Sequence, residues 1–240
     1  MSARAGSAWS QKVLRAKSLA RRRETLAQAL RQDGIDALIA YGTGRHSFLA
    51  SNPAWYVTGF RQLGPHMAVL LPCDGEPAAI VTPARDRARF REQSEIGEIT
   101  AVEPDAFLGA TQTAVEKRGL RGKRIAVAGG VQPRAVGDAW PSILGTTPLS
   151  GEKLVSDIAK VRDEWALACV REGAEIAERG WQRALEAARP GMAEYELAGE
   201  IEAYMRELGA DDNFQLLSAS QHNRAAHRPS DRALAAGDVL

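Results

Sequence analysis

The hydrophobic positions near the N-terminus follow a helical period. Leu14, Leu19, Leu26 and Leu30 form a stripe, and this spacing predicts an amphipathic helix. The residues before Glu24 include many Arg and Lys and no Asp or Glu. An Arg-rich, acid-poor segment is also typical of a transit peptide. We favour the alternative, in which the charges form the solvated face of an ordinary helix.

From Ile35 onward, short apolar runs alternate with more polar stretches of helical character. Strands are predicted at residues 35–41, 55–58, 67–71, 78–82, 99–102 and 124–128. Helices are predicted at residues 85–93, 106–118 and 135–144, the last of them broken by Pro141. The strands at 67–71 and 78–82 flank a polar turn and so predict a hairpin. This alternation is typical of an α/β domain with a mixed sheet.

The pattern changes near residue 150. Residues 153–189 are almost all helix formers, residues 194–208 predict a second amphipathic helix, and residues 214–219 predict a strand. A polar loop with two histidines then leads to Gly237–Leu240, which has the character of a strand start. We therefore predict two domains, at residues 1–150 and 151–240. The fold class is α/β (α+β), with a mixed-sheet domain first.

Composition and charge narrow the classes of function. The chain has 240 residues, of which 45% are hydrophobic and 25% charged, as in ordinary globular proteins. Its 31 basic and 30 acidic residues argue against nucleic acid or a membrane as the main partner. No apolar run has the length of a membrane span. Cys73 and Cys169 are predicted to be buried thiols of a reducing compartment, which favours a cytoplasmic protein.

Gly129-Gly130 follows a predicted strand and raises the question of a phosphate loop. The stretch lacks both the G-x-G-x-x-G spacing and the Lys-Ser/Thr pair of such loops. We interpret it as a strand-to-helix turn.

Three stretches of the second segment resemble one known family. They are Ile158-Ala159-Lys160-Val161-Arg162-Asp163-Glu164-Trp165, Arg189-Pro190-Gly191-Met192-Ala193-Glu194-Tyr195-Glu196-Leu197-Ala198 and His227-Arg228-Pro229-Ser230-Asp231-Arg232. They resemble the pita-bread fold of the creatinase, prolidase and Xaa-Pro aminopeptidase family (M24). Ile35–Ile39 and Trp55–Phe60 resemble the N-terminal domain of the same proteins. The resemblance covers nearly the whole chain and implies that residues 151–240 form the first half of a pita-bread domain.

The resemblance also implies what is missing. The peptidases of this family use a pair of divalent metals (Mn, Co or Zn) held by aspartates, glutamates and a histidine. The resemblance places all these ligands beyond Leu240, and we predict no metal ligand within the chain. Asp211-Asp212 is interpreted as a solvated turn, because adjacent carboxylates point apart. We therefore expect the 240 residues alone to lack metallopeptidase activity.

The candidate site residues follow from the same resemblance. His227 matches the family's cleft histidine and is the catalytic candidate, since imidazole can act as acid or base near neutral pH. His222 is a substrate-binding candidate on the same loop. The alternative for both is a surface loop without a role.

The N-terminal segment offers further candidates. Phe60, Arg61 and His66 are substrate-binding candidates, because the N-terminal domain of the family reaches over a catalytic cleft, in some cases that of a partner subunit. The alternative is that Phe60 packs and Arg61 pairs with a surface carboxylate. His46 is interpreted as a capping or surface residue. Trp165 and Trp181 are predicted to be core residues.

Four functions remain open. The resemblance favours a hydrolase of the Xaa-Pro aminopeptidase or dipeptidase type that acts on peptides as a cytoplasmic homodimer. A metal-free, creatinase-like amidinohydrolase with a histidine base would act on a small amide. A pita-bread module without catalysis would bind peptides. An incomplete half-domain would expose apolar surface and associate.

Overall fold

The computed structural model describes residues 2–44, 52–130, 132–210, 213–222 and 225–240, with side chains from residue 12 onward. The chain divides into two compact units, Met1–Trp165 and Ala166–Leu240. This division falls after the domain boundary predicted near residue 150, because the helix that follows that position packs its Val155 into the core of the first unit. None of the described helices is long and apolar enough to cross a membrane.

The first unit is built on a six-stranded sheet. Its strands are β1 (Ala37–Gly42), β2 (Met67–Pro72), β3 (Ala78–Val81), β4 (Glu98–Ala101), β5 (Ile125–Ala128) and β6 (Leu149–Ser150). Their order in the sheet is β4-β3-β2-β1-β5-β6. β2 is antiparallel to both of its neighbours, and the other neighbouring pairs are parallel. The mixed sheet and the β2–β3 hairpin predicted from the sequence are therefore confirmed.

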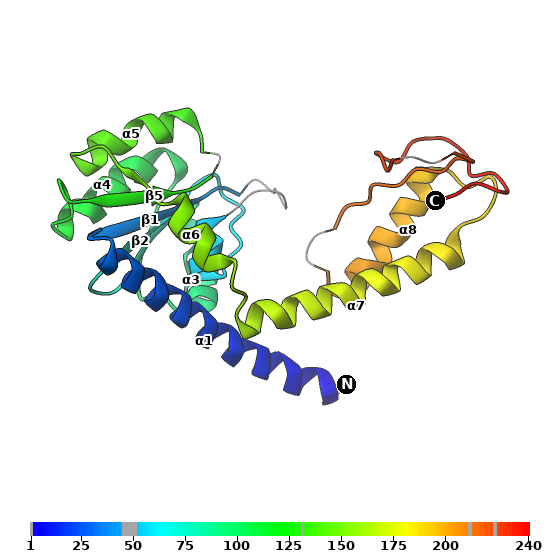
Figure 1. Ribbon diagram of the computed structural model, residues 1–240, viewed down its shortest axis with the longest axis horizontal. Coiled ribbons are helices and arrows are strands. Elements are labelled where there is room, and N and C mark those ends of the chain that lie inside the picture. The colour runs from blue at the N-terminus through cyan, green and yellow to red at the C-terminus, as the bar shows by residue number, and fades with distance from the viewer. Residues whose placement is uncertain (1, 45–51, 131, 211–212, 223–224) are drawn as a thin grey trace. The chain divides into compact units, whose positions relative to one another are not determined.

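Helices cover both faces of this sheet (Figure 1). They are α1 (Ser2–Gln32), α2 (Pro53–Thr58), α3 (Arg87–Ser94), α4 (Phe107–Lys117), α5 (Arg134–Leu144) and α6 (Glu152–Ala159), with short 3-10 turns at Ala84–Asp86 and Pro104–Ala106. α4 and α5 cover one face, and α1, α2, α3 and α6 contribute to the core on the other. All six residues of β1 are buried, as expected for a central strand between two layers of helices.

The second unit begins at Ala166, within the long helix α7 (Glu164–Ala187). It continues with the helix α8 (Glu194–Glu207) and the C-terminal segment from residue 213. A small core joins these parts through Ala184, Leu197, Ile201, Ala219 and Leu234. The helices pack closely where Gly180 of α7 faces Met205 of α8, since a Cβ at Gly180 would lie 2.9 Å from the Met205 side chain.

Two predicted strands are wrong. Residues 55–58 belong to α2, which begins at an N-cap Asn52 whose side chain accepts from the Trp55 amide and has Pro53 in its first turn. These start signals outweigh the strand preference of aromatic and β-branched residues. Residues 214–219, all described, form no regular strand. Instead, Ser220 makes one isolated antiparallel bridge with Val239.

Two helix predictions also need correction. The helix predicted over residues 153–189 is two helices, α6 and α7, with a break that no Pro or Gly marks. α5 runs through Pro141 instead of breaking there. Its residues Trp140, Ile143 and Leu144 are buried against the sheet, and this packing offsets the cost of proline in a helix.

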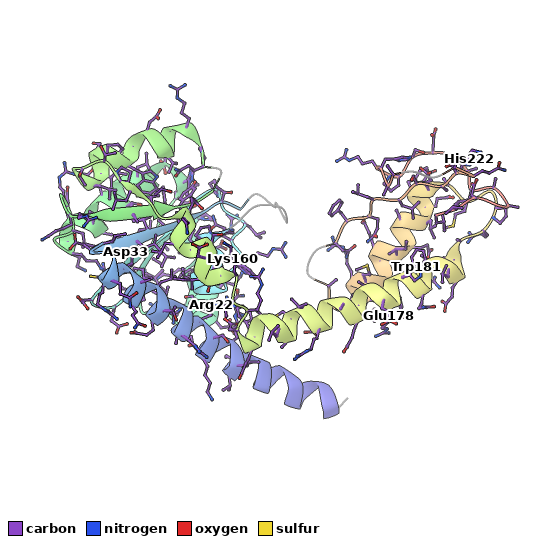
Figure 2. The ribbon with its side chains drawn as sticks, in the orientation of Figure 1. Arg22, Asp33, Lys160, Glu178, Trp181 and His222 are labelled. Atoms are coloured by element: carbon purple, nitrogen blue, oxygen red, sulfur yellow. The ribbon has the colours of Figure 1, made fainter. Side chains whose placement is uncertain are left out.

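Four burial predictions are wrong. The Trp181 side chain is 52% exposed on α7 (Figure 2), and Trp165 is only half-buried. Cys169 is exposed and Cys73 is half-buried. The apolar spacing that places Trp181 on one helix face does not say whether another layer covers that face.

The Gly129-Gly130 turn is held by a carboxylate of the same chain. Glu152, in the first turn of α6, accepts from the amides of Gly129 (2.6 Å) and Gly130 (2.7 Å) through one oxygen, Oε1. A Cβ at Gly129 would lie 2.9 Å from the ring of Tyr41. The glycines therefore serve the turn and its packing, in agreement with the interpretation from sequence.

An ion pair holds the break between α6 and α7 against α1. Arg22 is buried, and its guanidinium donates to both oxygens of Asp163 at 2.6 and 3.1 Å. The same guanidinium lies over the rings of Tyr56 (4.7 Å) and Trp165 (4.8 Å). This arrangement combines a bidentate ion pair with cation–π contacts, which suits arginine and not lysine.

Replacing Arg22 tests this clamp. Arg22→Ala removes the bidentate pair with Asp163 and both cation–π contacts, and we expect the first unit to lose about 3–5 kcal/mol of unfolding free energy, as for breaking a buried pair. Arg22→Lys keeps the charge but loses the fork and the stacking, so its loss should be smaller. Urea denaturation followed by circular dichroism measures both.

Arg134→Ala is the control, because its pair with Asp138 is exposed at both partners and should contribute at most about 1 kcal/mol. Equal losses for Arg22→Ala and Arg134→Ala would contradict the clamp.

Candidate functional site

The two predicted loop histidines lie on a segment that folds back on itself. The Leu217 amide donates to the carbonyl oxygen of His227 (2.9 Å), and Ser218 Oγ donates to that of Ala225 (2.7 Å). These bonds close a loop that carries His222 and His227. Isolated backbone hydrogen bonds and side-chain hydrogen bonds, and not a sheet, therefore hold this segment in place.

A buried carboxylate fastens this segment to the start of α8. Glu194 is fully buried. Its Oε1 accepts from the Ala219 amide (2.7 Å), and its Oε2 accepts from the amide (2.9 Å) and hydroxyl (2.6 Å) of Ser230. Three donors from both sides of the loop therefore converge on one side chain.

The surroundings of Glu194 favour its ionised form. Burial alone would raise the pKa of this carboxyl group, but the hydrogen bonds from Ser230 and Ala219 and the charge of His227 outweigh it. The net result is a pKa below the ordinary value for glutamate. Glu194 is therefore a fixed negative charge beneath the histidine loop.

The end of the segment is held separately. Arg232 donates to both oxygens of Asp238 (2.7 and 2.9 Å), and one of these oxygens also accepts from the Ala235 amide. The Asp238 side chain is only 4% exposed. Arg232 lowers the pKa of this carboxyl group, with the Ala235 amide as the next cause. This bidentate pair fixes the turn that follows the loop.

His227 is exposed, and its ring has a defined proton arrangement. Its Nδ1 lies 2.7 Å from the carbonyl oxygen of Arg228. A carbonyl oxygen can only accept, so Nδ1 carries the proton and Nε2 of the neutral ring keeps its lone pair. His227 can therefore accept a proton, or donate one once protonated, through Nε2.

His222 lies on the same loop and is also exposed (Figure 2). In the described part of the chain, the backbone amide of His222 donates a hydrogen bond to Ser220 Oγ (3.3 Å). Nothing in these contacts orients its ring, in contrast to His227.

The N-terminal candidates lie in the first unit. Phe60 is fully buried, its ring packs edge-on against Phe90 (5.1 Å between centroids), and Arg89 lies over it. Within this unit, Phe60 is therefore a packed core residue, as in the alternative interpretation of the sequence. The half-buried Arg61 follows it, and its carbonyl oxygen accepts from Arg89.

His66 is half-buried at the start of β2. Its Nδ1 lies 2.9 Å from the hydroxyl of Tyr41, and its ring stacks on Phe107. Burial lowers the pKa of this imidazole. The roles of His66, Phe60 and Arg61 in substrate binding stay predictions, as do those of His222 and His227.

Some predicted features fall outside the described residues, namely His46 and the pair Asp211-Asp212. Within the described parts of the chain, no group of three or more His, Cys, Asp or Glu side chains could hold a metal ion. The residues present there do not fit a metal pair, and we derive no reaction step through one.

Comparisons with known proteins identify the family. The model of the creatinase/prolidase N-terminal domain matches residues 22–160, and that of metallopeptidase family M24 matches residues 168–240. The chain belongs to the creatinase/prolidase family of M24 metallopeptidases. The first unit is its creatinase-type N-terminal domain, and the M24 match covers the second unit from residue 168.

Individual relatives agree with this family. An uncharacterized peptidase, YqhT of Bacillus subtilis, is 24% identical over 90% of this chain and 58% of its own length. The fold is similar to that of dipeptidase PepE from Mycobacterium ulcerans (20% identity, TM-score 0.73, 93% of this chain and 59% of that one). It is also similar to the prolidase from Pyrococcus horikoshii (16% identity, TM-score 0.72, 91% and 58%). The chain thus spans less than two thirds of the length of these relatives.

Sequence reasoning missed two residues. Glu194 stands inside a stretch that was recognised as a family motif, but a lone glutamate at a helix start reads as an ordinary solvated residue. Tyr41 reads as the last apolar residue of a strand. Only the distances to Ser230 and His66 show that the two side chains organise the candidate histidines.

Replacing Glu194 tests the support of the loop. Glu194→Gln keeps the shape but replaces one accepting oxygen by a donor, so it cannot accept all three hydrogen bonds. We expect a loss of about 1–3 kcal/mol in the second unit, with faster hydrogen exchange at the Ala219 and Ser230 amides. Glu196→Gln is the matched control, since among the described residues the exposed Glu196 accepts from the Ala193 amide at its own helix start. Unchanged exchange in Glu194→Gln would contradict the role.

The lowered pKa of Glu194 predicts a loss of order at acid pH. The stabilisation is fully present above the unfolded-state pKa of about 4.3 and is lost as the pH falls through the lower folded-state pKa. The amide resonances of Ala219 and Ser230, followed from neutral to acid pH, should therefore move together below that value. A transition centred above it would mean that the pKa is not lowered.

Proposed function

We propose that the protein is a hydrolase of the Xaa-Pro aminopeptidase or dipeptidase type that acts on peptides. The proposal is supported by the order of the two family models along the chain. The structural relatives include a dipeptidase and a prolidase, which supports the same proposal. Metal dependence is implied by the M24 family.

The geometry that carries the proposal is the ordered histidine loop. Glu194 and the two loop-closing bonds fix the backbone on both sides of His227. The bond to the Arg228 carbonyl leaves Nε2 of His227 able to accept or donate a proton. Such a group can hydrogen-bond a substrate amide or assist proton transfer during cleavage.

The binding candidates have distinct roles in this proposal. His222 is proposed to contact substrate from the same loop, and Phe60, Arg61 and His66 to contribute from the N-terminal domain. We further propose that the protein works in the cytoplasm as a homodimer.

A comparison of substrates and variants of the whole protein tests the function. Cleavage of Ala-Pro and Ala-Pro-Ala but not of Ala-Ala-Ala, with added Mn²⁺, is the expected result. His227→Ala should lower kcat by about 10²-fold or more, the usual size of a proton-transfer contribution. His222→Ala is the matched control on the same loop and should affect mainly KM.

Other outcomes would point elsewhere. Activity on a small amide that survives chelation and depends on His227 would favour a creatinase-like amidinohydrolase. Peptide binding without any cleavage would favour a binding module. Full activity of His227→Ala would contradict the assigned role.

A further inference from the structure

His66 lies at the edge of the sheet where α/β proteins commonly bind ligands. β1 and β3 end at this edge, and β2 begins there, because Met67 pairs with Gly42 and with Val81. His66 precedes Met67. Crevices outside the carboxyl ends of parallel strands are the usual ligand sites of open α/β sheets.

Strand geometry brings His66 to Tyr41. Side chains alternate along a strand, so His66 shares a face with Ala68 and Leu70, which belong to the core beneath α4 and α5. Tyr41 pairs directly with Ala68 and is therefore the diagonal neighbour of His66.

The position of His66 is fixed by several contacts. Its amide donates to Thr82 Oγ1 (3.1 Å), and its carbonyl oxygen accepts from the same hydroxyl (2.7 Å). Its ring stacks on Phe107 with centroids 4.9 Å apart and an interplanar angle of 25°. A ring held in this way can present a polar atom in one direction.

The hydroxyl of Tyr41 decides which nitrogen of His66 carries the proton. Tyr41 is fully buried, and burial raises its pKa to about 12, so the phenol keeps its proton. In the described part of the chain, the acceptor within reach of that proton is His66 Nδ1, at 2.9 Å. Because a buried donor without an acceptor is costly, the hydroxyl donates to Nδ1.

The other ring nitrogen then becomes a donor. With Nδ1 accepting, the neutral ring carries its proton on Nε2. No group in the described residues hydrogen-bonds this Nε2. Burial lowers the pKa of the ring, so His66 is neutral at neutral pH. A neutral N–H group donates a hydrogen bond to an oxygen acceptor and carries no net charge of its own.

We propose that Tyr41 is a positioning residue that holds His66 as an Nε2–H donor to a main-chain carbonyl or terminal carboxylate of a peptide. The class of ligand rests on the proposed peptidase function, but the proton arrangement does not. It predicts that His66 and His227 are opposite tautomers, one presenting a donor and the other an acceptor.

Nitrogen NMR of the histidine rings tests the proposal directly. The full 240-residue chain is labelled with ¹⁵N-histidine, and His66 is assigned by the signals lost in His66→Gln. We expect the Nε2–H pattern for His66 at neutral pH. Tyr41→Phe keeps the ring but removes the donor, so this single pattern should give way to a mixture of tautomers. Tyr56→Phe, elsewhere in the same unit, is the control and should leave the pattern unchanged.

Two probes then identify the acceptor. Ala-Pro carries a free carboxylate, and Ala-Pro amide carries only carbonyl groups. A shift of the His66 Nε2 signal with both supports recognition of a carbonyl, and a shift with Ala-Pro alone supports a carboxylate. Both shifts should be lost in Tyr41→Phe.

Contrary results separate the two claims. An Nδ1–H pattern in the unmodified protein, or an unchanged pattern in Tyr41→Phe, overturns the role of Tyr41. A fixed Nε2–H pattern that neither probe perturbs overturns recognition of a peptide oxygen. Because no readout needs turnover, the tautomer result does not depend on hydrolysis, and a failure of the whole protein to cleave peptides would refute only the proposed function.

Discussion

A single buried carboxylate orders the least regular part of the chain. The residues from 213 onward have almost no regular secondary structure, so their backbone groups cannot satisfy one another along a ladder. Glu194 instead accepts hydrogen bonds from Ala219 and Ser230, which lie on either side of the histidine loop. It remains ionised at neutral pH because the hydrogen bonds to its charged form outweigh the cost of burial. The placement of His227 depends on this one side chain more than on any helix or strand.

His66 and His227 show how a neighbouring group decides what an imidazole can do. His227 faces a carbonyl oxygen, and His66 faces a phenol whose proton has no other acceptor in the described residues. The same residue type is thereby prepared for opposite hydrogen-bonding roles. Neither arrangement needs a charged partner, and each is made within its own compact unit.

The fold was largely predictable from the sequence, because burial on both faces gives strands such as β1 and β5 continuous apolar runs. The errors have definite physical causes. Trp55–Thr58 has the side chains of a strand, but Asn52 and Pro53 start a helix there. The break before α7 is held against α1 by the Arg22–Asp163 pair, a contact between residues far apart in the chain that no local pattern records.

The candidate site was less predictable than the fold. Motif resemblance could single out His227 because the residues around it form a recognisable stretch. It could not single out Glu194 or Tyr41, because their importance lies in contacts with residues far along the chain. The stripe containing Trp181 was open to two interpretations, a core face or apolar surface exposed by an incomplete half-domain, and Trp181 is 52% exposed.

The contact between Glu152 and the Gly129-Gly130 amides has a consequence for ligand choice. Paired backbone amides at the end of a parallel strand are a natural cradle for phosphate. Here a carboxylate of the same domain already occupies them, and a tethered competitor acts at an effective concentration of roughly millimolar or more. A free nucleotide would have to displace it and also meet its negative charge. The amides of Gly129 and Gly130 are therefore already satisfied within the domain and are not available to a phosphate group.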